Sequence, residues 1–270
     1  MLGKLIKYEF KHTSKTMLTT FIVLALATAM GSFGLYRLNR LSNEKTLLSI
    51  VGVIMLVIYI IALIGVYCGD FIYLCYHYHK TMYSSQGYLT HTLPVSPSAT
   101  LGAKVLVFFI WMLISTILLM LSGIVLLQVG SDGQFLREFA GLSWEGFSRD
   151  LMKLFGFSAN FFLFIVIIAM LLNILYYVLF ITASMAIGQL FQKGRTGFSI
   201  LAGFIIYTLN QIVNTIYMAV SGYSTGLFLE GNLKNFMRKI TIGSLGITVL
   251  FLIVLYGICI MINKKKLNLE

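Results

Sequence analysis

The chain has 270 residues, of which 59% are hydrophobic and only 11% are charged, and its mean hydropathy is +0.91. A soluble domain of this size could not bury so much apolar surface. The chain contains 24 glycines and only two prolines, a composition that excludes collagen-like and proline-rich disordered chains. The formal net charge of +11 does not indicate nucleic-acid binding, because the basic residues are spread along the chain next to apolar segments, where lipid contact explains them. We therefore expect a polytopic membrane protein.

The first sixteen residues are predicted to form an amphipathic helix. At 100° per residue, its side chains divide into an apolar arc of Leu2, Leu5, Ile6, Phe10 and Thr13 and a basic arc of Lys4, Lys7, Lys11 and Lys15. Such a helix lies on the inner leaflet with its lysines among anionic head groups. It serves either as a topological anchor alone or also as part of a docking surface.

Glu9 falls in the middle of the apolar arc of this segment. A carboxylate is costly to desolvate without a partner, so we expect an ion pair or hydrogen bonds between Glu9 and another cytoplasmic element. Arg195 and Lys193 are the first candidates for that partner.

Six apolar segments contain no Lys, Arg, Asp or Glu, and each has 20 to 27 residues. About 20 residues of helix cross roughly 30 Å of hydrocarbon. The segments are continuously apolar rather than alternating, which favours helices over a β-barrel. We predict an all-α polytopic membrane protein with one transmembrane domain over residues 1–270, whose spans lie at residues 17–36, 47–69, 105–127, 161–187, 197–220 and 241–262.

An even number of spans places both termini on the same side of the membrane. Eleven of the 20 Lys and Arg residues lie on that side, and this excess favours cytoplasmic termini. In this orientation Cys68, Cys75 and Cys259 lie near the inner ends of their spans, so we expect free thiols rather than disulfides.

The connection from Asp70 to Lys104 is the longest cytoplasmic segment in this topology. Residues 71–90 are aromatic and polar without a run of helix breakers, so the second span is predicted to continue beyond the bilayer and then fold into a short helix. Pro94 and Pro97 disfavour helix before them, and Ser96 or Ser98 can cap the helix that becomes the third span. This hairpin would present a protein-facing surface.

Two stretches carry a family resemblance: LGKLIKYEFK at residues 2–11 and SSQGYLTHTLPVSPSATLGAK at residues 84–104. Together with the six-span layout they resemble the membrane subunits of ABC-2 type (type V-like) ABC exporters, particularly small bacterial permeases of peptide-antibiotic resistance and export. The resemblance implies a bacterial cell-membrane protein in which the amphipathic helix and the loop after the second span, the coupling helix, rest on a separate ATP-binding subunit. The residues implied to face that ATPase are Gln86, Gly87, Tyr88, Leu89, Thr90 and His91, with Glu9 from the amphipathic helix.

The same resemblance implies two ATP-binding subunits and a second membrane subunit, identical or paralogous. It also implies short re-entrant helices before the last span, with which residues 221–240 are compatible. The connection at residues 128–160 is longer than the resemblance leads us to expect. Within it, residues 143–155 are amphipathic, with Trp144 suited to the head-group zone, and form either an interfacial segment or a lid.

No G-x-x-x-x-G-K-[ST] motif occurs in the sequence, so no nucleotide site or cofactor is expected in this chain, and ATP and Mg²⁺ would belong to the partner ATPase. We do not expect this chain to be an enzyme. His77 and His79 form an H-x-H pattern without a further ligand at metal-binding spacing, which favours an ordinary interfacial pair over a metal site. Asp70 is expected to be a carboxylate at head-group level, paired with a nearby lysine.

Intramembrane amides are the remaining functional candidates. Asn210, Gln211 and Asn214 fall in the fifth predicted span and Asn173 in the fourth. They either hold helices together or line a translocation path. The leading interpretation is a permease subunit that exports an amphipathic substrate, an antimicrobial peptide or a lipid. The alternative is a non-transporting sensor or accessory subunit that docks an ATPase through the same loop.

Overall fold

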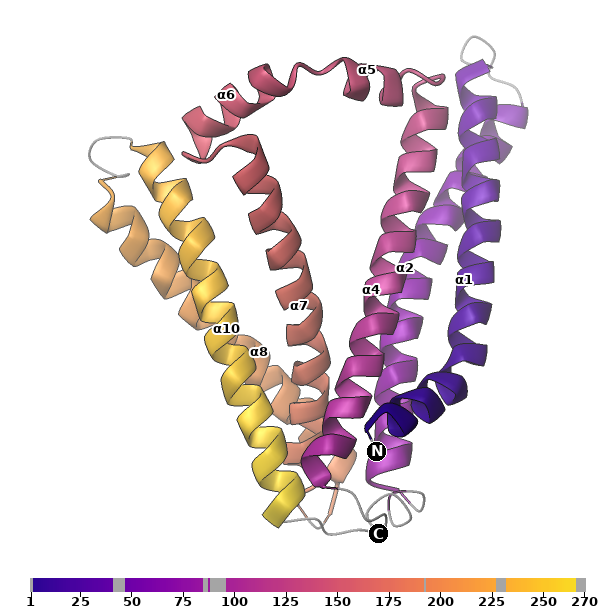
Figure 1. Ribbon diagram of the computed structural model, residues 1–270. Helices are drawn as coiled ribbons and strands as arrows, with labels where there is room; N and C mark the ends of the chain where they lie inside the picture. Colours follow the sequence, from indigo (N-terminus) through magenta and orange to yellow (C-terminus); the bar gives the residue numbers. More distant parts are fainter. Residues whose placement is uncertain are drawn as a thin grey trace. The chain divides into compact units, whose positions relative to one another are not determined.

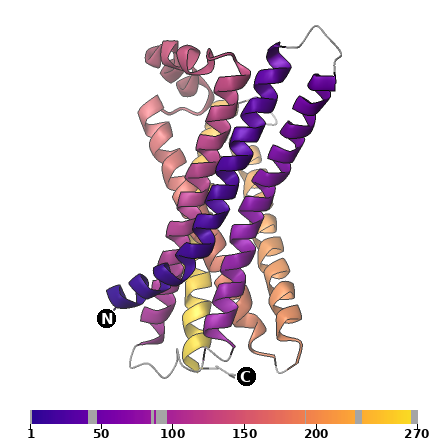
Figure 2. The same ribbon diagram turned by 90° about the vertical axis from the view of Figure 1, so that its right-hand side faces the viewer.

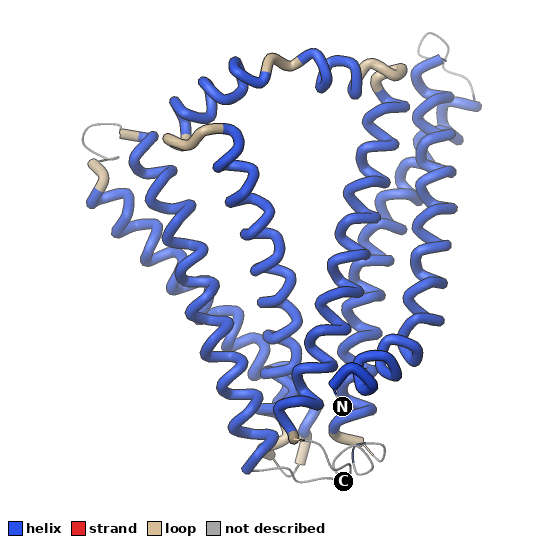
Figure 3. The backbone as a smooth tube through the Cα atoms, viewed as in Figure 1, coloured by secondary structure: helices blue, strands red, loops and turns tan. Residues whose placement is uncertain are grey.

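The computed structural model describes residues 2–40, 47–84, 87, 96–191, 193–226 and 232–265. Within these residues the regular structure consists of eight α-helices (Figure 3). Six of them are long and apolar enough to cross a membrane, and each contains one predicted span. These six are α1 (Leu2–Arg40), α2 (Leu47–Met82), α4 (Pro97–Gly130), α7 (Ala159–Gly188), α8 (Arg195–Ser224) and α10 (Leu233–Lys265). The all-α class is confirmed, and the six helices are those of a multi-pass membrane protein.

The chain divides into two compact units. The first comprises Met1–His77 and Leu106–Leu142, and the second comprises Tyr78–Val105 and Ser143–Glu270. The first unit therefore contains α1, most of α2 and α4, and the short helix α5 (Phe135–Gly141). The second contains α6 (Trp144–Leu154), α7, α8 and α10, together with the end of α2 and the start of α4.

In the first unit, α1, α2 and α4 run alongside one another (Figures 1 and 2). Glycines bring α1 and α2 close together: a Cβ at Gly34 would lie 2.8 Å from the Gly52 carbonyl oxygen, and a Cβ at Gly31 would lie 2.7 Å from the Tyr59 ring. Small residues at such contacts let membrane helices approach closely enough for dispersion forces to hold them.

The amphipathic segment and the first span form one continuous helix, α1, rather than two separate helices. The sequence between them contains no proline or glycine that would end a helix. Figure 1 shows α1 changing direction after its first turns. Hydroxyl groups bond back to the helix there, with Thr13 Oγ1 donating to the Glu9 carbonyl at 3.0 Å and Ser14 Oγ donating to the Lys11 carbonyl at 2.9 Å. Such bonds often accompany helix bends.

Helix α2 continues without a break to Met82, as its aromatic, breaker-free sequence predicts. Its 36 residues correspond to a length of about 54 Å. Helix α4 begins where capping chemistry places it, with Pro97 as the first helical residue. The Ser96 hydroxyl accepts a hydrogen bond from the Ala99 N–H at 3.4 Å, so Ser96 is the cap.

In the second unit, α7 packs against both α8 and α10 (Figure 1). Small residues again permit the closest approach, because a Cβ at Gly188 would overlap Ser199 of α8 and one at Gly203 would lie 3.3 Å from the Ser184 hydroxyl of α7. The predicted amphipathic segment at residues 143–155 forms α6, in which Leu151 is buried and Ser143 caps the first turn by accepting a hydrogen bond from the Gly146 N–H at 3.3 Å.

The structure differs from the expected re-entrant helices before the last span. Residues 233–240 are the first turns of α10 itself, which runs unbroken to Lys265. Residues 227–231 lie outside the described part of the chain.

Candidate functional site

Of the six residues that the resemblance assigns to the coupling helix, the structure describes Gly87 alone. Gly87 is buried, and its N–H donates to the Ser84 carbonyl at 2.6 Å. Gln86 and residues 88–91 lie outside the described residues.

Glu9 has a partner of the kind that its position in an apolar arc predicts. Its Oε1 lies 2.7 Å from Nε2 of His77 on α2, and the two side chains are 16% and 4% exposed. His77 belongs to the same unit as Glu9. A charge-assisted hydrogen bond of this kind satisfies a carboxylate withdrawn from water.

Aromatic packing holds the amphipathic segment next to this pair. The Phe10 ring stacks on Trp111 of α4, with 4.4 Å between ring centroids and 15° between planes. The Trp111 indole N–H donates to the Thr13 hydroxyl at 2.8 Å, and Thr13 is fully buried. The apolar arc therefore packs against α4 and α2 instead of facing only lipid, which favours more than a simple anchor.

Asp70 is not the head-group carboxylate paired with lysine that the sequence led us to expect. Its side chain is fully buried and accepts a hydrogen bond from the Ser115 hydroxyl of α4 at 2.7 Å. The Thr20 hydroxyl also lies nearby, but it donates to the Met17 carbonyl at 2.8 Å. The Asp70 Oδ1 atom has no hydrogen-bond partner among the described residues.

The difference arises because α2 does not end at the first charged residue after its apolar run. Asp70 and His77 are seven residues apart, which places them on the same face of the helix. Helix continuation therefore carries both side chains inward. No sequence signal pairs His77 with Glu9, because that pairing depends on the packing of α1 on α2.

A second buried polar cluster lies in the other unit, directly before the coupling segment. The Tyr83 hydroxyl donates to Asn263 Oδ1 of α10 at 3.2 Å, and it lies 3.5 Å from the Tyr78 hydroxyl. Burial raises the pKa of the Tyr83 phenol above its usual value, so this group stays a neutral donor. The Lys104 ammonium, 4% exposed, donates to the Thr81 hydroxyl at 2.8 Å. Sequence reasoning did not single out these residues, because nothing in the local pattern connects positions so far apart.

The four intramembrane amides have exposed or half-buried side chains. Asn173 and Gln211 are exposed, and Asn210 and Asn214 are half-buried. Two of these side-chain amides donate hydrogen bonds within their own helices: Asn173 Nδ2 donates to the Ala169 carbonyl at 2.8 Å, and Asn214 Nδ2 donates to the Asn210 carbonyl at 2.9 Å. The Tyr176 hydroxyl of α7 lies near Asn210 without a hydrogen bond of acceptable geometry.

These side-chain positions bear on the two roles left open by the sequence. In the described part of the chain, the recorded hydrogen bonds of Asn173 and Asn214 do not join one helix to another. Exposed amides are costly against lipid tails unless protein or water covers them. No three His, Cys, Asp or Glu side chains among the described residues are grouped as metal ligands would be.

Comparisons with protein-family models, with curated proteins and with solved structures gave no match to this chain. The fold therefore defines the class by itself: an all-α membrane protein with six long apolar helices and buried polar clusters on α2 next to the predicted coupling segment.

Proposed function

We propose that this chain is the transmembrane permease subunit of an ATP-driven ABC exporter, located in the bacterial cell membrane with cytoplasmic termini. It moves an amphipathic substrate, an antimicrobial peptide or a lipid. Two separate ATP-binding subunits, which hold ATP and Mg²⁺, supply the energy, and a second membrane subunit completes the path. The observation that carries the proposal is the fastening of the amphipathic segment to the part of α2 that leads into residues 84–104.

Three contacts support this role for the amphipathic segment. The Glu9–His77 pair ties it to α2, while Phe10 and Thr13 tie it to Trp111 of α4. An element that served only to set topology would need its lysines and its apolar arc, but no buried carboxylate. A segment that must move together with α2 needs directional contacts such as these.

The length of α2 also supports the proposal. A helix of about 54 Å exceeds the roughly 30 Å of hydrocarbon, so part of α2 extends beyond the bilayer at a modest tilt. The segment that resembles the coupling helix begins directly after this part. With the termini in the cytoplasm, as proposed, this segment would lie within reach of an ATP-binding subunit.

The translocation path is proposed to use the amides of α7 and α8. Asn173 and Gln211 are exposed on helices otherwise covered with apolar side chains. A second membrane subunit, or the aqueous path between two subunits, would provide the polar surroundings that lipid does not. The ATPase can shift such a path between two states only by binding them differently.

The proposal is tested by purifying the full-length tagged chain from its host membrane and assaying the eluate for ATP hydrolysis. We expect an ATPase to copurify and its turnover to rise with a cationic antimicrobial peptide. Tyr88→Ala should reduce that stimulation at least about tenfold, because coupling requires contact at this loop. Tyr223→Ala, at a side chain that is 78% exposed on α8, is the matched control and should leave the stimulation unchanged.

Two results would contradict export. Copurification of an ATPase whose turnover no peptide or lipid changes would favour the sensor or accessory role. Labelling of a cysteine at position 88 by a membrane-impermeant maleimide from the outside of intact cells, with the three native cysteines replaced by serine, would place the loop beyond the reach of any ATPase.

A further inference from the structure

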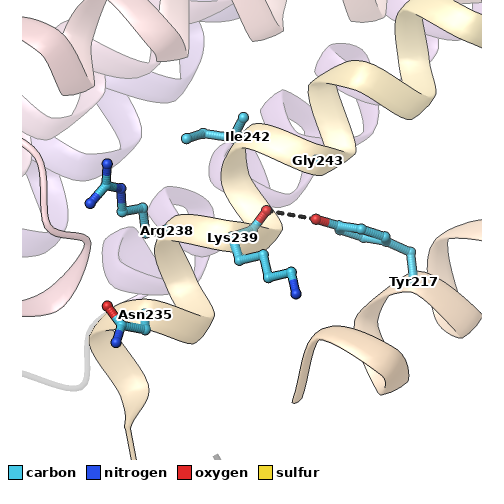
Figure 4. Close-up of a pocket in the computed structure, with 6 residues that line it drawn as sticks. All are labelled: Tyr217, Asn235, Arg238, Lys239, Ile242 and Gly243. Atoms are coloured by element: carbon cyan, nitrogen blue, oxygen red, sulfur yellow. Dashed lines mark hydrogen bonds between the residues drawn. The ribbon is translucent and has the colours of Figure 1, made fainter. Parts of the chain in front are cut away.

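A basic cavity lies where α8 ends and α10 begins, away from the sites described above. It has a volume of about 310 Å³ and is lined by Tyr217, Asn235, Arg238, Lys239, Ile242 and Gly243. Figure 4 shows Lys239 projecting from α10 on the side of Tyr217 of α8, with Asn235 and Arg238 on the other side of the helix.

The charges around this cavity are of one sign. Arg238 and Lys239 contribute two cations, and none of the six lining residues is acidic. Among the described residues no carboxylate lies within ion-pair distance of either cation. Arg238 instead sits over the Phe157 ring, 5.9 Å from its centroid.

The helix direction adds to the positive potential. Both cations lie near the N-terminus of α10, and the first turn of α10 carries no acidic residue. The partial positive charge of a helix N-terminus disfavours cations and favours an anion. Side chains with this arrangement are stabilised when a negatively charged group binds between them.

Hydrogen bonds between α8 and α10 hold the walls of the cavity in place. The Tyr217 hydroxyl donates to the Lys239 carbonyl at 2.9 Å, and Lys239 Nζ donates to the Ser224 hydroxyl at 2.7 Å. A Cβ at residue 243 would overlap Tyr217, so only glycine permits this approach of α8 to α10. The hydrogen bond to Ser224 gives the ammonium group of the exposed Lys239 side chain a defined position next to the cavity.

The position along the helices identifies the ligand class. The charge-free apolar segments end at residue 220 on α8 and begin at residue 241 on α10, which places the cavity at the depth expected for head groups. Apolar side chains are exposed next to it on both helices, with Ile242 and Ile216 exposed by 50% and 58%. A phosphate next to two cations, with acyl chains along such a surface, matches an anionic phospholipid.

We propose that this cavity binds the phosphate-bearing head group of an anionic phospholipid, with Arg238 and Lys239 as the anion-binding residues and Tyr217 and Gly243 as positioning residues. The site is independent of the export role, because none of its residues belongs to the coupling segment or to the intramembrane amides. Its occupancy would fasten the end of α8 to the start of α10.

Native mass spectrometry of the purified full-length chain tests the proposal by titration with phosphatidylglycerol and with zwitterionic phosphatidylcholine. We expect tighter binding of phosphatidylglycerol. The double substitution Arg238→Gln and Lys239→Gln should weaken phosphatidylglycerol binding about thirtyfold, and either single substitution about fivefold. The charge-preserving pair Arg238→Lys and Lys239→Arg should retain binding, and the single variants serve if the double variant does not fold.

The matched control removes two cations from another exposed helix of the same unit, by Arg149→Gln and Lys153→Gln on α6, and should change the affinity less than about twofold. Equal binding by the wild type and the Arg238/Lys239 variant would overturn the proposal. So would an equal loss in the α6 control, which would indicate general surface electrostatics. Displacement of the lipid by inorganic phosphate at matched concentration would identify a free-phosphate site and also overturn the assignment to lipid.

Discussion

The two units use intramembrane polar side chains in opposite ways. In the first unit they join helices: Ser122 of α4 lies 2.8 Å from the Thr28 hydroxyl of α1 and 2.8 Å from the Tyr59 hydroxyl of α2. In the second unit Asn173 and Asn214 bond to their own helices, and the cross-helix contact between Thr182 and Cys259 is a weak one at 3.6 Å.

This difference teaches how each unit is held together. The first relies on directional bonds added to a close glycine contact, so its helices have a defined register. In the second unit the contact between α7 and α8 relies on small residues, with Gly188 and Gly203 at the closest approach and Ala183 and Ala186 fully buried on α7. The side-chain amides of α7 and α8 that are not needed for packing within the unit remain available to hydrogen-bond with a molecule that lies against these helices.

The largest expected effect comes from removing the aromatic anchor of the first unit. Trp111→Ala should lower the free energy of unfolding by about 3–5 kcal/mol, because it removes a buried ring that stacks on Phe10 and donates to Thr13. Trp144→Ala, at a side chain that is 50% exposed on α6, is the matched control and should change it by less than about 0.5 kcal/mol. Thermal and denaturant unfolding of the purified chain measure both, and equal losses would show that the anchor has no special role.

An intermediate effect is expected at the Glu9–His77 pair. A double-mutant cycle with Glu9→Ala and His77→Ala should give a coupling energy of about 1.5–3 kcal/mol, the range for a hydrogen bond to a charged group. The same cycle with Glu9→Ala and His79→Ala is the control and should give a value near zero. A negligible coupling for Glu9 and His77 would mean that the packing of Phe10 alone positions the amphipathic segment.

The smallest effects on stability should distinguish the two units most directly. Ser122→Ala removes two cross-helix hydrogen bonds and should cost about 0.6–2 kcal/mol. Replacing both Asn210 and Asn214 with Leu should cost the isolated chain less than about 0.5 kcal/mol, because the recorded bonds of Asn214 stay within α8.

The effects of these two variants on export should be in the reverse order of their effects on stability. The Asn210/Asn214 double variant is expected to abolish peptide-stimulated export while the assembled complex still purifies, whereas Ser122→Ala should leave export intact. Loss of assembly in the asparagine variant would instead indicate that these amides hold subunits or helices together.

The sequence predicted most of the fold because its strongest signals are local. Charge-free apolar runs located all six membrane helices, and Ser96 with Pro97 located the start of α4. The change of direction within α1 was not predictable in this way, because no breaker lies between the amphipathic segment and the first span. Helix α5 was not predicted either, since it is short and depends on Gln128, whose Oε1 accepts a hydrogen bond from the Leu136 N–H at 2.9 Å.

The candidate site was less predictable because it depends on contacts between distant residues. The need of Glu9 for a partner followed from its place in an apolar arc, but His77 follows only from the packing of α1 on α2. Asp70 was assigned to the head-group region because a charge normally marks the end of a span. The unbroken helix around it places the carboxylate in the packed interior instead.

The continuity of α2 has a mechanical consequence. A straight helix of about 54 Å behaves as a lever arm, so a tilt of about 5° displaces its far end by about 5 Å. A push of a few ångströms delivered at Met82 would thus reach Leu47 without any change in the internal hydrogen bonds of the helix. A proline inserted midway would kink the helix and absorb that displacement.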